Sequence, residues 1–258
     1  MNYKAICFFD LDGTLLDEKS QVTADVVAAI NKLKKNNILP MIATGRALIE
    51  AQEVIDASGM NSIVALNGLH IQIEGKTIFA QEFPREYIQP LIDKTKELGH
   101  SLSFFNEEDA WAVHTNDVFI KAFERLAAPL PKISEDLHLS QKILMPVITT
   151  DVPETDELYR QAIPGLKFYR TTPEIIDVVP HGTDKGTGVR TVLELLGAQD
   201  IPTYAFGDGS NDLALLAAVD NKIAMGNAID ELKAIADYVS ANNSDGGLIQ
   251  ALDYYGLI

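Results

Sequence analysis

The sequence predicts an α/β fold, a doubly wound parallel sheet that is interrupted by an inserted α+β segment. Three observations predict it. Short apolar runs alternate with amphipathic stretches up to residue 82, strands and helices then mix without that alternation, and the first pattern resumes at Asp184. Because the same architecture lies on both sides of the middle segment, we expect an insertion, while a second tandem domain stays the alternative.

The N-terminal part has the pattern of three buried strands joined by helices and followed by a hairpin. Apolar runs predict the strands, and the helical spacing of apolar residues behind the capping residue Thr23 predicts the first helix. The expected elements are a strand at 4–9, a helix at 23–36, a strand at 38–43, a helix at 47–58, a strand at 62–66 and a hairpin at 69–80 turning at Glu74 and Gly75.

The middle segment, residues 83–182, is predicted to form the insertion, and residues 1–82 and 183–258 to form the core domain. Trp111, Phe104 and Phe105 are expected in the hydrophobic core of the insertion. Its expected elements are a helix at 85–98, strands at 101–106 and 111–115, a helix at 119–127, a strand at 143–149, a helix at 153–162 and two strands ending at 179. The last part predicts a helix at 184–196, a strand at 203–206, a helix from 211, a strand at 223–225, a helix near 231, a short strand at 238 and a helix from 245.

Composition narrows the classes of function. The 258 residues carry a formal net charge of -16, and no cluster of Lys or Arg compensates it locally, so a nucleic-acid partner is not expected. No stretch reaches the length of a membrane span, and a single cysteine, Cys7, excludes an internal disulfide. We therefore expect a cytoplasmic protein with no membrane partner. If its substrate is anionic, the site needs a metal ion and one or two cations to reverse the local field.

Two carboxylates directly follow the first buried strand. Asp10 and Asp12 lie two residues apart, which in extended backbone places them on one side, and Gly13 lets the chain turn away. Open α/β sheets bind ligands at this edge. Two close carboxylates can divide the work of nucleophile and general acid/base. The alternative interpretation of Asp10 to Thr14 is an ordinary Asp-Gly turn with a helix cap.

The second strand also ends in polar groups. The hydroxyl of Thr44 and the amide of Gly45 could bind phosphate oxygens at the start of the following helix, although a plain helix cap explains Thr44 equally well. Arg46 could face a substrate or pair with an acidic neighbour.

A second acidic cluster follows the strand at 203–206. Asp208 and Asp212 lie in a glycine-rich run with Asn211, and carboxylate oxygens of this kind are ligands for a hard divalent cation such as Mg²⁺. A glycine-rich turn with a capped helix is the alternative. Because both acidic clusters end strands of the core, one sheet edge could bring them together.

Lys185 opens the helix at which the core pattern resumes. A cation at a helix N-terminus opposes the helix dipole, so it indicates an anionic partner such as a phosphate or Asp10, although most lysines are simply solvated. None of the five histidines occupies the place of a catalytic base.

Taken in order, these motifs resemble the haloacid dehalogenase-like superfamily, and within it the Cof-type sugar phosphatases of type IIB, which have a large α/β cap of the C2B kind. Four motifs carry the resemblance: Asp10 to Thr14, Thr44 with Gly45, Lys185, and Gly207 to Asp212. Asn67 with Gly68, Met225 to Ala228 and Asp245 to Gly247 extend it over essentially the whole chain.

The resemblance implies a Rossmann-like core, with residues 83–182 as the cap, and it implies a role for each matching residue. Asp10 would be the nucleophile and Asp12 the general acid/base. Mg²⁺ would be held by the carboxylates of Asp10 and Asp208 and by the backbone carbonyl of Asp12. The remaining assignments are phosphate binding by the backbone of Leu11, Thr44, the amide of Gly45, Lys185 and Asn211, and orientation of metal-bound water by Asp212.

The implied reaction is hydrolysis of a small phosphorylated metabolite through an aspartyl-phosphate. A sugar phosphate is the preferred substrate, with pyridoxal phosphate or a flavin nucleotide as alternatives. A phosphomutase of the same superfamily and a sugar-phosphate-binding regulator without turnover stay open as other functions. The sequence leaves the oligomeric state undetermined.

Overall fold

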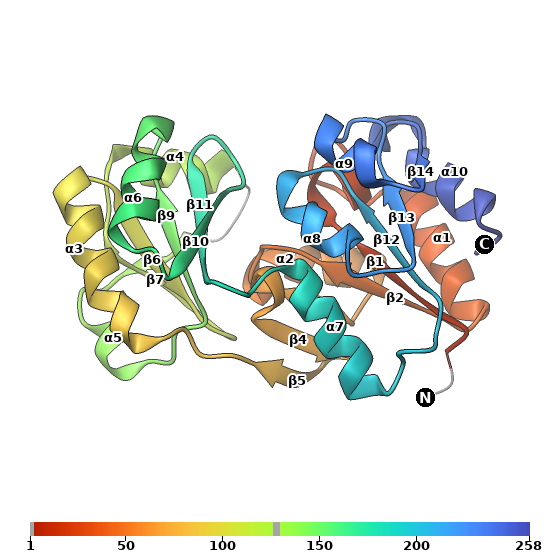
Figure 1. Cartoon of the computed structure of the whole chain (residues 1–258), viewed down its shortest axis with the longest axis horizontal. Coiled ribbons are helices and arrows are strands. Elements are labelled where there is room, and N and C mark those ends of the chain that lie inside the picture. The colour runs from red at the N-terminus through yellow and green to blue at the C-terminus, as the bar shows by residue number, and fades with distance from the viewer. Residues whose placement is uncertain (1–2, 126–129) are drawn as a thin grey trace. The chain divides into compact units, whose positions relative to one another are not determined.

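The computed structural model describes residues 3–125 and 130–258, and the chain divides into two compact units. The core unit comprises Met1–Arg46, Ala51–Phe79 and Asp184–Ile258, and the inserted unit comprises Ala47–Glu50 and Ala80–Thr183. Figure 1 shows a mixed sheet with helices in each unit.

An eight-stranded sheet organises the core unit, in the order β14-β13-β12-β1-β2-β3-β4-β5. The strands from β14 to β3 pair in parallel, and β4 pairs antiparallel with β3. Since β1 lies between β2 and β12, the chain runs outward from β1 in both directions. This reversal of direction beside β1 is where open α/β sheets place their ligand sites.

The elements of the core unit form largely where apolar spacing predicts them. Thr23 caps the first helix, because its hydroxyl accepts the Val26 backbone N–H. Glu74 and Gly75 have positive φ angles of 50° and 77°, as a two-residue hairpin turn requires. The elements are β1 (Ala5–Phe9), α1 (Ala24–Lys35), β2 (Ile38–Ala43), α2 (Leu48–Ser58), β3 (Ile63–Ala65), β4 (His70–Ile73), β5 (Lys76–Ala80), α7 (Lys185–Leu196), β12 (Thr203–Gly207), α8 (Leu213–Leu216), β13 (Asn221–Ala224), α9 (Asp230–Ile235), β14 (Tyr238–Val239) and α10 (Gly247–Tyr254).

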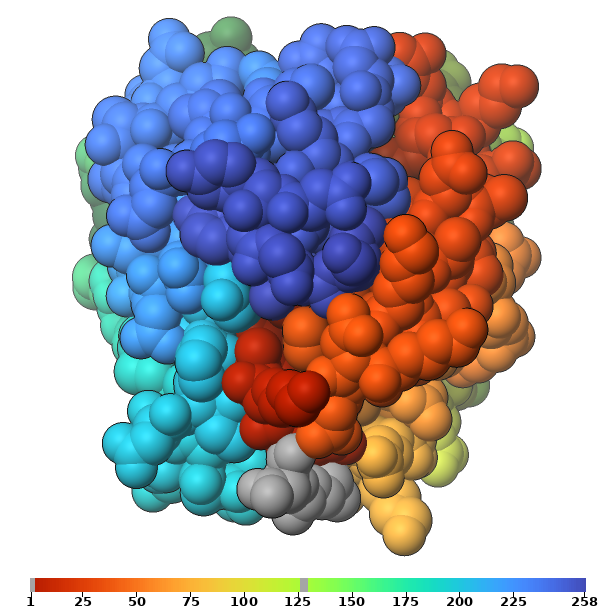
Figure 2. Space-filling model, turned by 90° about the vertical axis from the view of Figure 1, so that its right-hand side faces the viewer, coloured from red at the N-terminus to blue at the C-terminus, as the bar shows by residue number. Residues whose placement is uncertain are grey.

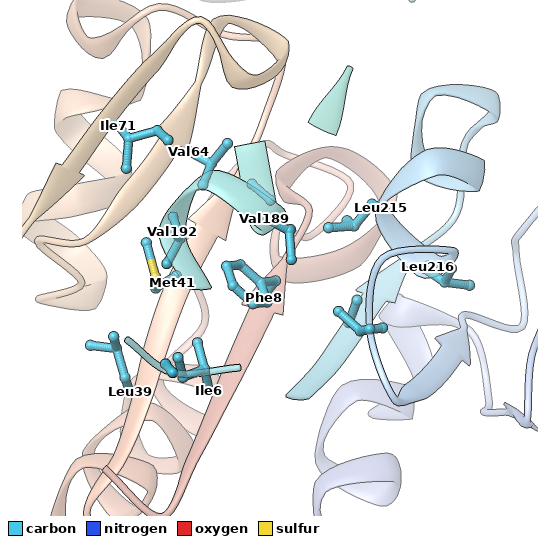
Figure 3. Close-up of a cluster of buried hydrophobic side chains, with 14 of the residues drawn as sticks. Ile6, Phe8, Leu39, Met41, Val64, Ile71, Val189, Val192, Leu215 and Leu216 are labelled. Atoms are coloured by element: carbon cyan, nitrogen blue, oxygen red, sulfur yellow. The ribbon is translucent and has the colours of Figure 1, made fainter. Parts of the chain in front are cut away.

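The two faces of this sheet are covered by different helices. On one face, side chains of β1 to β4 pack against α7 and α8, as Figure 3 shows for Phe8, Met41, Val189 and Leu215. On the other side of the unit, the C-terminal segment with α10 lies beside the segment with α1, dark blue against orange-red in Figure 2. Burial of apolar side chains on both faces explains why β1 and β2 are apolar throughout, and it confirms the expected doubly wound sheet.

Helix α7 approaches the sheet so closely that a side chain at Gly188 has no room. A Cβ atom there would lie 2.4 Å from Val64 Cγ1 and 2.9 Å from Gly68 Cα. At an exposed position inside a helix, Gly→Ala stabilises the protein by ~1 kcal/mol. Here we expect Gly188→Ala to lower the free energy of unfolding in urea by ~1–3 kcal/mol through overpacking. The control Glu194→Ala changes an exposed residue of the same helix, and it should leave the free energy of unfolding within ~0.5 kcal/mol of the wild-type value. A stabilised Gly188→Ala protein would contradict the close approach.

The inserted unit contains its own six-stranded sheet, in the order β10-β11-β9-β6-β7-β8. Its hydrophobic core includes Trp111 and Phe104, as expected, with Leu91 of α3 and Tyr159 of α6. The elements are α3 (Ile88–Leu98), β6 (Ser101–Phe105), β7 (Ala110–His114), α4 (Asp117–Arg125), β8 (Lys132–Ile133), α5 (Leu137–Ser140), β9 (Met145–Thr149), α6 (Asp156–Ala162), β10 (Leu166–Arg170) and β11 (Ile175–Pro180). Mixed strands and helices confirm the expected α+β character of the insertion.

A few elements differ from the sequence prediction. The short β8 and α5 were not predicted, because two and four residues give too little periodicity. The predicted helix at 119–127 is α4, which ends at Arg125, and residues 126 and 127 lie outside the described part of the chain. Among the helices that the structure describes, none has the length and apolar character of a membrane span.

Candidate active site

Three of the expected site segments follow the carboxyl ends of neighbouring parallel strands. Asp10 directly follows β1, Thr44 follows β2, and Asp208 follows β12. Strand β1 is paired with both of the others, with Phe9 in register with Ile42 and Phe206. Parallel strands in register end at the same edge, so the three segments meet there.

Lys185 is brought to this edge as the first residue of α7. Asp184 caps the helix by accepting the Thr187 backbone N–H at 2.8 Å, while the Thr187 hydroxyl accepts the Asp184 N–H at 2.9 Å. The Lys185 side chain is only 1% exposed, and its Nζ donates to Oδ1 of Asp10 at 2.5 Å and to Oδ1 of Asp212 at 2.7 Å. The anionic partners expected for Lys185 are therefore two carboxylates at the same edge of the sheet, those of Asp10 and Asp212.

Three carboxylates converge around this lysine. Asp10, Asp208 and Asp212 each offer one oxygen, and these oxygens lie within 4.8 Å of one another. Burial and the nearby charge of Asp212 raise the pKa of Asp10 well above its usual value, against the opposing effect of Lys185. The same causes raise the pKa of Asp208 to about 7. One buried ammonium thus faces more negative charge than it neutralises.

Lys185 remains a cation in this environment. Burial by itself lowers the pKa of its ammonium, but the charges and hydrogen bonds of Asp10 and Asp212 outweigh burial, so that the pKa is raised. The site therefore holds one fixed positive charge at the oxygen of Asp10.

The donor set fits a hard divalent cation. Asp212 uses both oxygens internally, because Oδ1 accepts from Lys185 and Oδ2 accepts the backbone N–H groups of Asp208 and Gly209 at 3.0 Å each. Asp10 and Asp208 are then the carboxylates whose excess negative charge a cation would balance, and oxygen ligands suit Mg²⁺. Gly13 makes the approach possible, since its φ is 74° and a Cβ would lie 2.2 Å from Asp208 Oδ2.

Asp12 lies differently from Asp10. Its side chain is 57% exposed, its carboxylate does not belong to the cluster of three, and both its oxygens accept from Arg46. The turn Leu11–Leu15, with Gly13 at positive φ, leads the chain away from the strand direction immediately after Asp12. Of the two partners considered for Arg46 from sequence, the structure shows the acidic neighbour.

The expected phosphate-binding groups surround the same edge. Leu11 is buried and begins the turn after Asp10, and Asn211 lies in the turn Ser210–Asp212 after β12. Thr44 is buried, and its hydroxyl accepts the Arg46 backbone N–H at 3.1 Å. Gly45 lies between these two residues, so its amide belongs to the same turn.

Asn227 has a position at the site that its sequence motif did not reveal. Its Nδ2 donates to the Gly13 carbonyl at 2.8 Å and to Oδ2 of Asp208 at 3.3 Å. Its own Oδ1 accepts the Asn243 backbone N–H at 2.9 Å, and Asn243 Nδ2 donates to the Leu16 carbonyl at 2.8 Å. The run Met225 to Ala228 formed part of the resemblance, but an Asn in a glycine-containing turn has no distinctive signal of function by itself.

The family model for haloacid dehalogenase-like hydrolases matches residues 7–252. The chain belongs to this family. The match spans both parts of the core and the insertion between them, and it confirms the resemblance that the motifs indicated, including its Cof-type character.

Individual proteins give the same result. The chain is 29% identical over 254 residues, 98% of both chains, to "Putative phosphatase YkrA" of Bacillus subtilis (strain 168). From the same organism, 5-amino-6-(5-phospho-D-ribitylamino)uracil phosphatase YwtE is 27% identical over 276 residues, with 95% of each chain covered. A solved structure of a hypothetical protein from Geobacillus kaustophilus HTA426 has a TM-score of 0.89 at 32% identity and covers 100% of both chains. Family and relatives confirm the expected enzyme class, a phosphatase of this superfamily.

Proposed function

We propose that the protein is a Mg²⁺-dependent phosphatase of the cytoplasm that hydrolyses a small phosphate monoester of a sugar or polyol through an aspartyl-phosphate on Asp10. The arrangement of Asp10 carries this proposal. Its carboxylate is buried, one oxygen accepts from Lys185, and Asp208 lies close enough to share a cation with it. A fixed carboxylate between positive charges suits in-line attack on a phosphate dianion, which would otherwise be repelled.

The proposed reaction has two balanced steps. In the first, an oxygen of Asp10 forms a bond to phosphorus while the bond from phosphorus to the leaving oxygen breaks, and Asp12 gives that oxygen a proton. In the second, Asp12 takes a proton from a water molecule that attacks phosphorus, and Asp10 leaves as carboxylate with inorganic phosphate as product. Lys185 and the turn of Thr44 and Gly45 would orient the phosphoryl oxygens.

Asp10, Asp208 and the backbone carbonyl of Asp12 would hold the Mg²⁺ ion. When bound, this ion would neutralise part of the negative charge of the phosphate group. Asp212 would keep the Asp208 loop in place through the hydrogen bonds that its Oδ2 accepts from the backbone N–H groups of Asp208 and Gly209.

Residues 83–182 are proposed to act as the cap that selects the substrate. The relative YwtE is named for a substrate whose phosphate is carried on a ribityl chain. This favours a sugar or polyol phosphate over a nucleotide, and the preference is open to direct test.

A phosphate-release panel tests the proposal. Sugar and polyol phosphates, nucleotides and phosphorylated cofactors are incubated with the protein in Mg²⁺ or in excess chelator. We expect release from at least one sugar or polyol phosphate, only with Mg²⁺. Formation of a sugar-phosphate isomer without net phosphate would indicate a phosphomutase, and binding without any turnover would indicate a regulator.

Asn227→Ala tests the proposed cation site through binding alone. Because Asn227 orients Asp208 and the Gly13 carbonyl, its loss should weaken Mg²⁺ binding by ~10-fold or more, measured by calorimetry without substrate. Asn36→Ala is the matched control, since its amide also donates to a backbone carbonyl, that of Leu257, but not at this site. Equal Mg²⁺ affinity in both variants would show that Asn227 does not support the cation.

A further inference from the structure

The ion pair between Arg46 and Asp12 joins two turns that follow neighbouring strands. Arg46 Nε donates to Oδ2 of Asp12 at 3.0 Å, and Nη2 donates to Oδ1 at 2.5 Å. Two parallel N–H···O bonds of this kind fix both the distance and the plane of a carboxylate, which a lysine cannot do. The pair therefore defines the orientation of the Asp12 side chain.

Arg46 is anchored much more firmly than its partner. Its backbone N–H donates to the Thr44 hydroxyl at 3.1 Å, its carbonyl accepts the Leu66 N–H at 3.1 Å, and its side chain is 17% exposed. The Asp12 side chain is 57% exposed on a turn. An exposed Asp on a turn ordinarily samples several rotamers, so the order at this pair comes from Arg46.

We propose that Arg46 is a positioning residue that holds the Asp12 carboxylate in the orientation from which it exchanges protons with the leaving oxygen and with water. This inference rests on the proposed function, in which Asp12 is the general acid/base. The bidentate contact is made to this particular carboxylate, and its effect is to specify the plane in which the two Asp12 oxygens lie. Arg46 acts through Asp12 and need not touch the substrate.

A double-mutant cycle separates this role from phosphate binding. Arg46→Gln, Asp12→Asn and the double variant are compared in kcat and KM on the best alkyl phosphate of the panel. We expect Arg46→Gln to lower kcat by ~10- to 100-fold with little change in KM, and Asp12→Asn by ~10²- to 10⁴-fold. Because both changes affect one group, adding Arg46→Gln to Asp12→Asn should cost nothing further. Multiplying effects, or a raised KM alone, would overturn the proposal and indicate contact with the substrate.

The leaving group offers a second readout. The p-nitrophenolate leaving group needs no proton, so in Arg46→Gln the first turnover of p-nitrophenyl phosphate should keep the wild-type rate in a rapid-mixing experiment. Later turnovers should be slow, because hydrolysis of the aspartyl-phosphate still needs Asp12 as base. A first turnover slowed as much as the later ones would contradict a role through Asp12. Arg190→Gln is the matched control, because the exposed Arg190 side chain lies in the core unit and reaches a carboxylate oxygen, that of Asp184, only at 3.9 Å; it should match wild type in both phases.

A measurement without turnover makes the two proposals distinguishable. The side-chain carboxyl ¹³C signal of Asp12 should show restricted motion in wild type and averaging in Arg46→Gln, whatever the enzyme hydrolyses. Identical Asp12 dynamics in the two proteins would overturn the positioning role. A wild type that releases phosphate from no compound would instead count against the proposed function, and the ¹³C result would still decide the role of Arg46.

Discussion

Asp10→Asn is expected to reduce phosphate release by at least ~10⁴-fold while the protein stays folded. An amide cannot form the bond to phosphorus that the carboxylate forms, and it also removes the charge beside Lys185 that a cation would share. The measurement is steady-state phosphate release with Mg²⁺, together with mass spectrometry of acid-quenched enzyme. Wild type should carry one phosphoryl group on the peptide containing Asp10, and the variant none.

Asp25→Asn is the matched control for this change. Asp25 is an exposed aspartate in the first turn of α1, so the same substitution there should leave turnover unchanged. If Asp10→Asn released phosphate at the wild-type rate, Asp10 would not be the nucleophile. If the phosphoryl group were found on another residue, the site would be correct but its nucleophile misassigned.

Lys185→Met is expected to lower both activity and stability. The methionine fills a similar volume but leaves the buried carboxylates of Asp10 and Asp212 without their cation. Removing one partner of a buried ion pair costs ~3–5 kcal/mol in the free energy of unfolding, and proton uptake by the carboxylates would bring the loss toward the lower figure. Phosphate release should fall by ~10²- to 10³-fold, as for loss of one donor to a developing charge.

Urea unfolding followed by circular dichroism measures the stability effect. The double variant Lys185→Met/Asp212→Asn should recover part of the lost free energy of unfolding, because only one of the two buried carboxylates then lacks its cation. Its activity should stay low, because the double variant still has no cation beside Asp10. A Lys185→Met protein as stable as wild type would show that the buried pair contributes no net stability.

The local elements were well predicted where a segment is long enough to show its period. Helix α1 begins after Thr23 as expected, and β2 spans Ile38–Ala43 as expected. Short segments were predicted less evenly: the strand expected at 238 is β14, but β13 ends at Ala224 instead of Met225, and β8 and α5 were missed. A segment of two to four residues takes its structure from the strand or helix beside it, and a linear pattern does not contain that neighbour.

At the site, the sequence indicated which polar residues lie at the carboxyl ends of the strands, but not which of their side chains form hydrogen bonds with one another. We could infer from the sequence that Lys185 has an anionic partner such as Asp10, because a cation at a helix N-terminus opposes the helix dipole. The bidentate contact of Arg46 with Asp12 and the bridge from Asn227 to Asp208 could not be inferred. Arg46 and Asp12 are 34 residues apart in the sequence, and Asn227 and Asp208 are 19 residues apart. The local sequence around one residue of such a pair does not specify its partner.

The sequence by itself determined the α/β class and the polar residues that follow β1, β2 and β12, because periodicity and strand-end motifs are local properties. Only the tertiary structure decided that Lys185 bridges Asp10 and Asp212, that Asp12 turns to Arg46, and that Asn227 supports Asp208. The physical reason is that hydrophobic burial fixes the packing of strands and helices without regard to individual polar groups. The directional polar contacts then form between whichever side chains that packing brings within hydrogen-bonding distance.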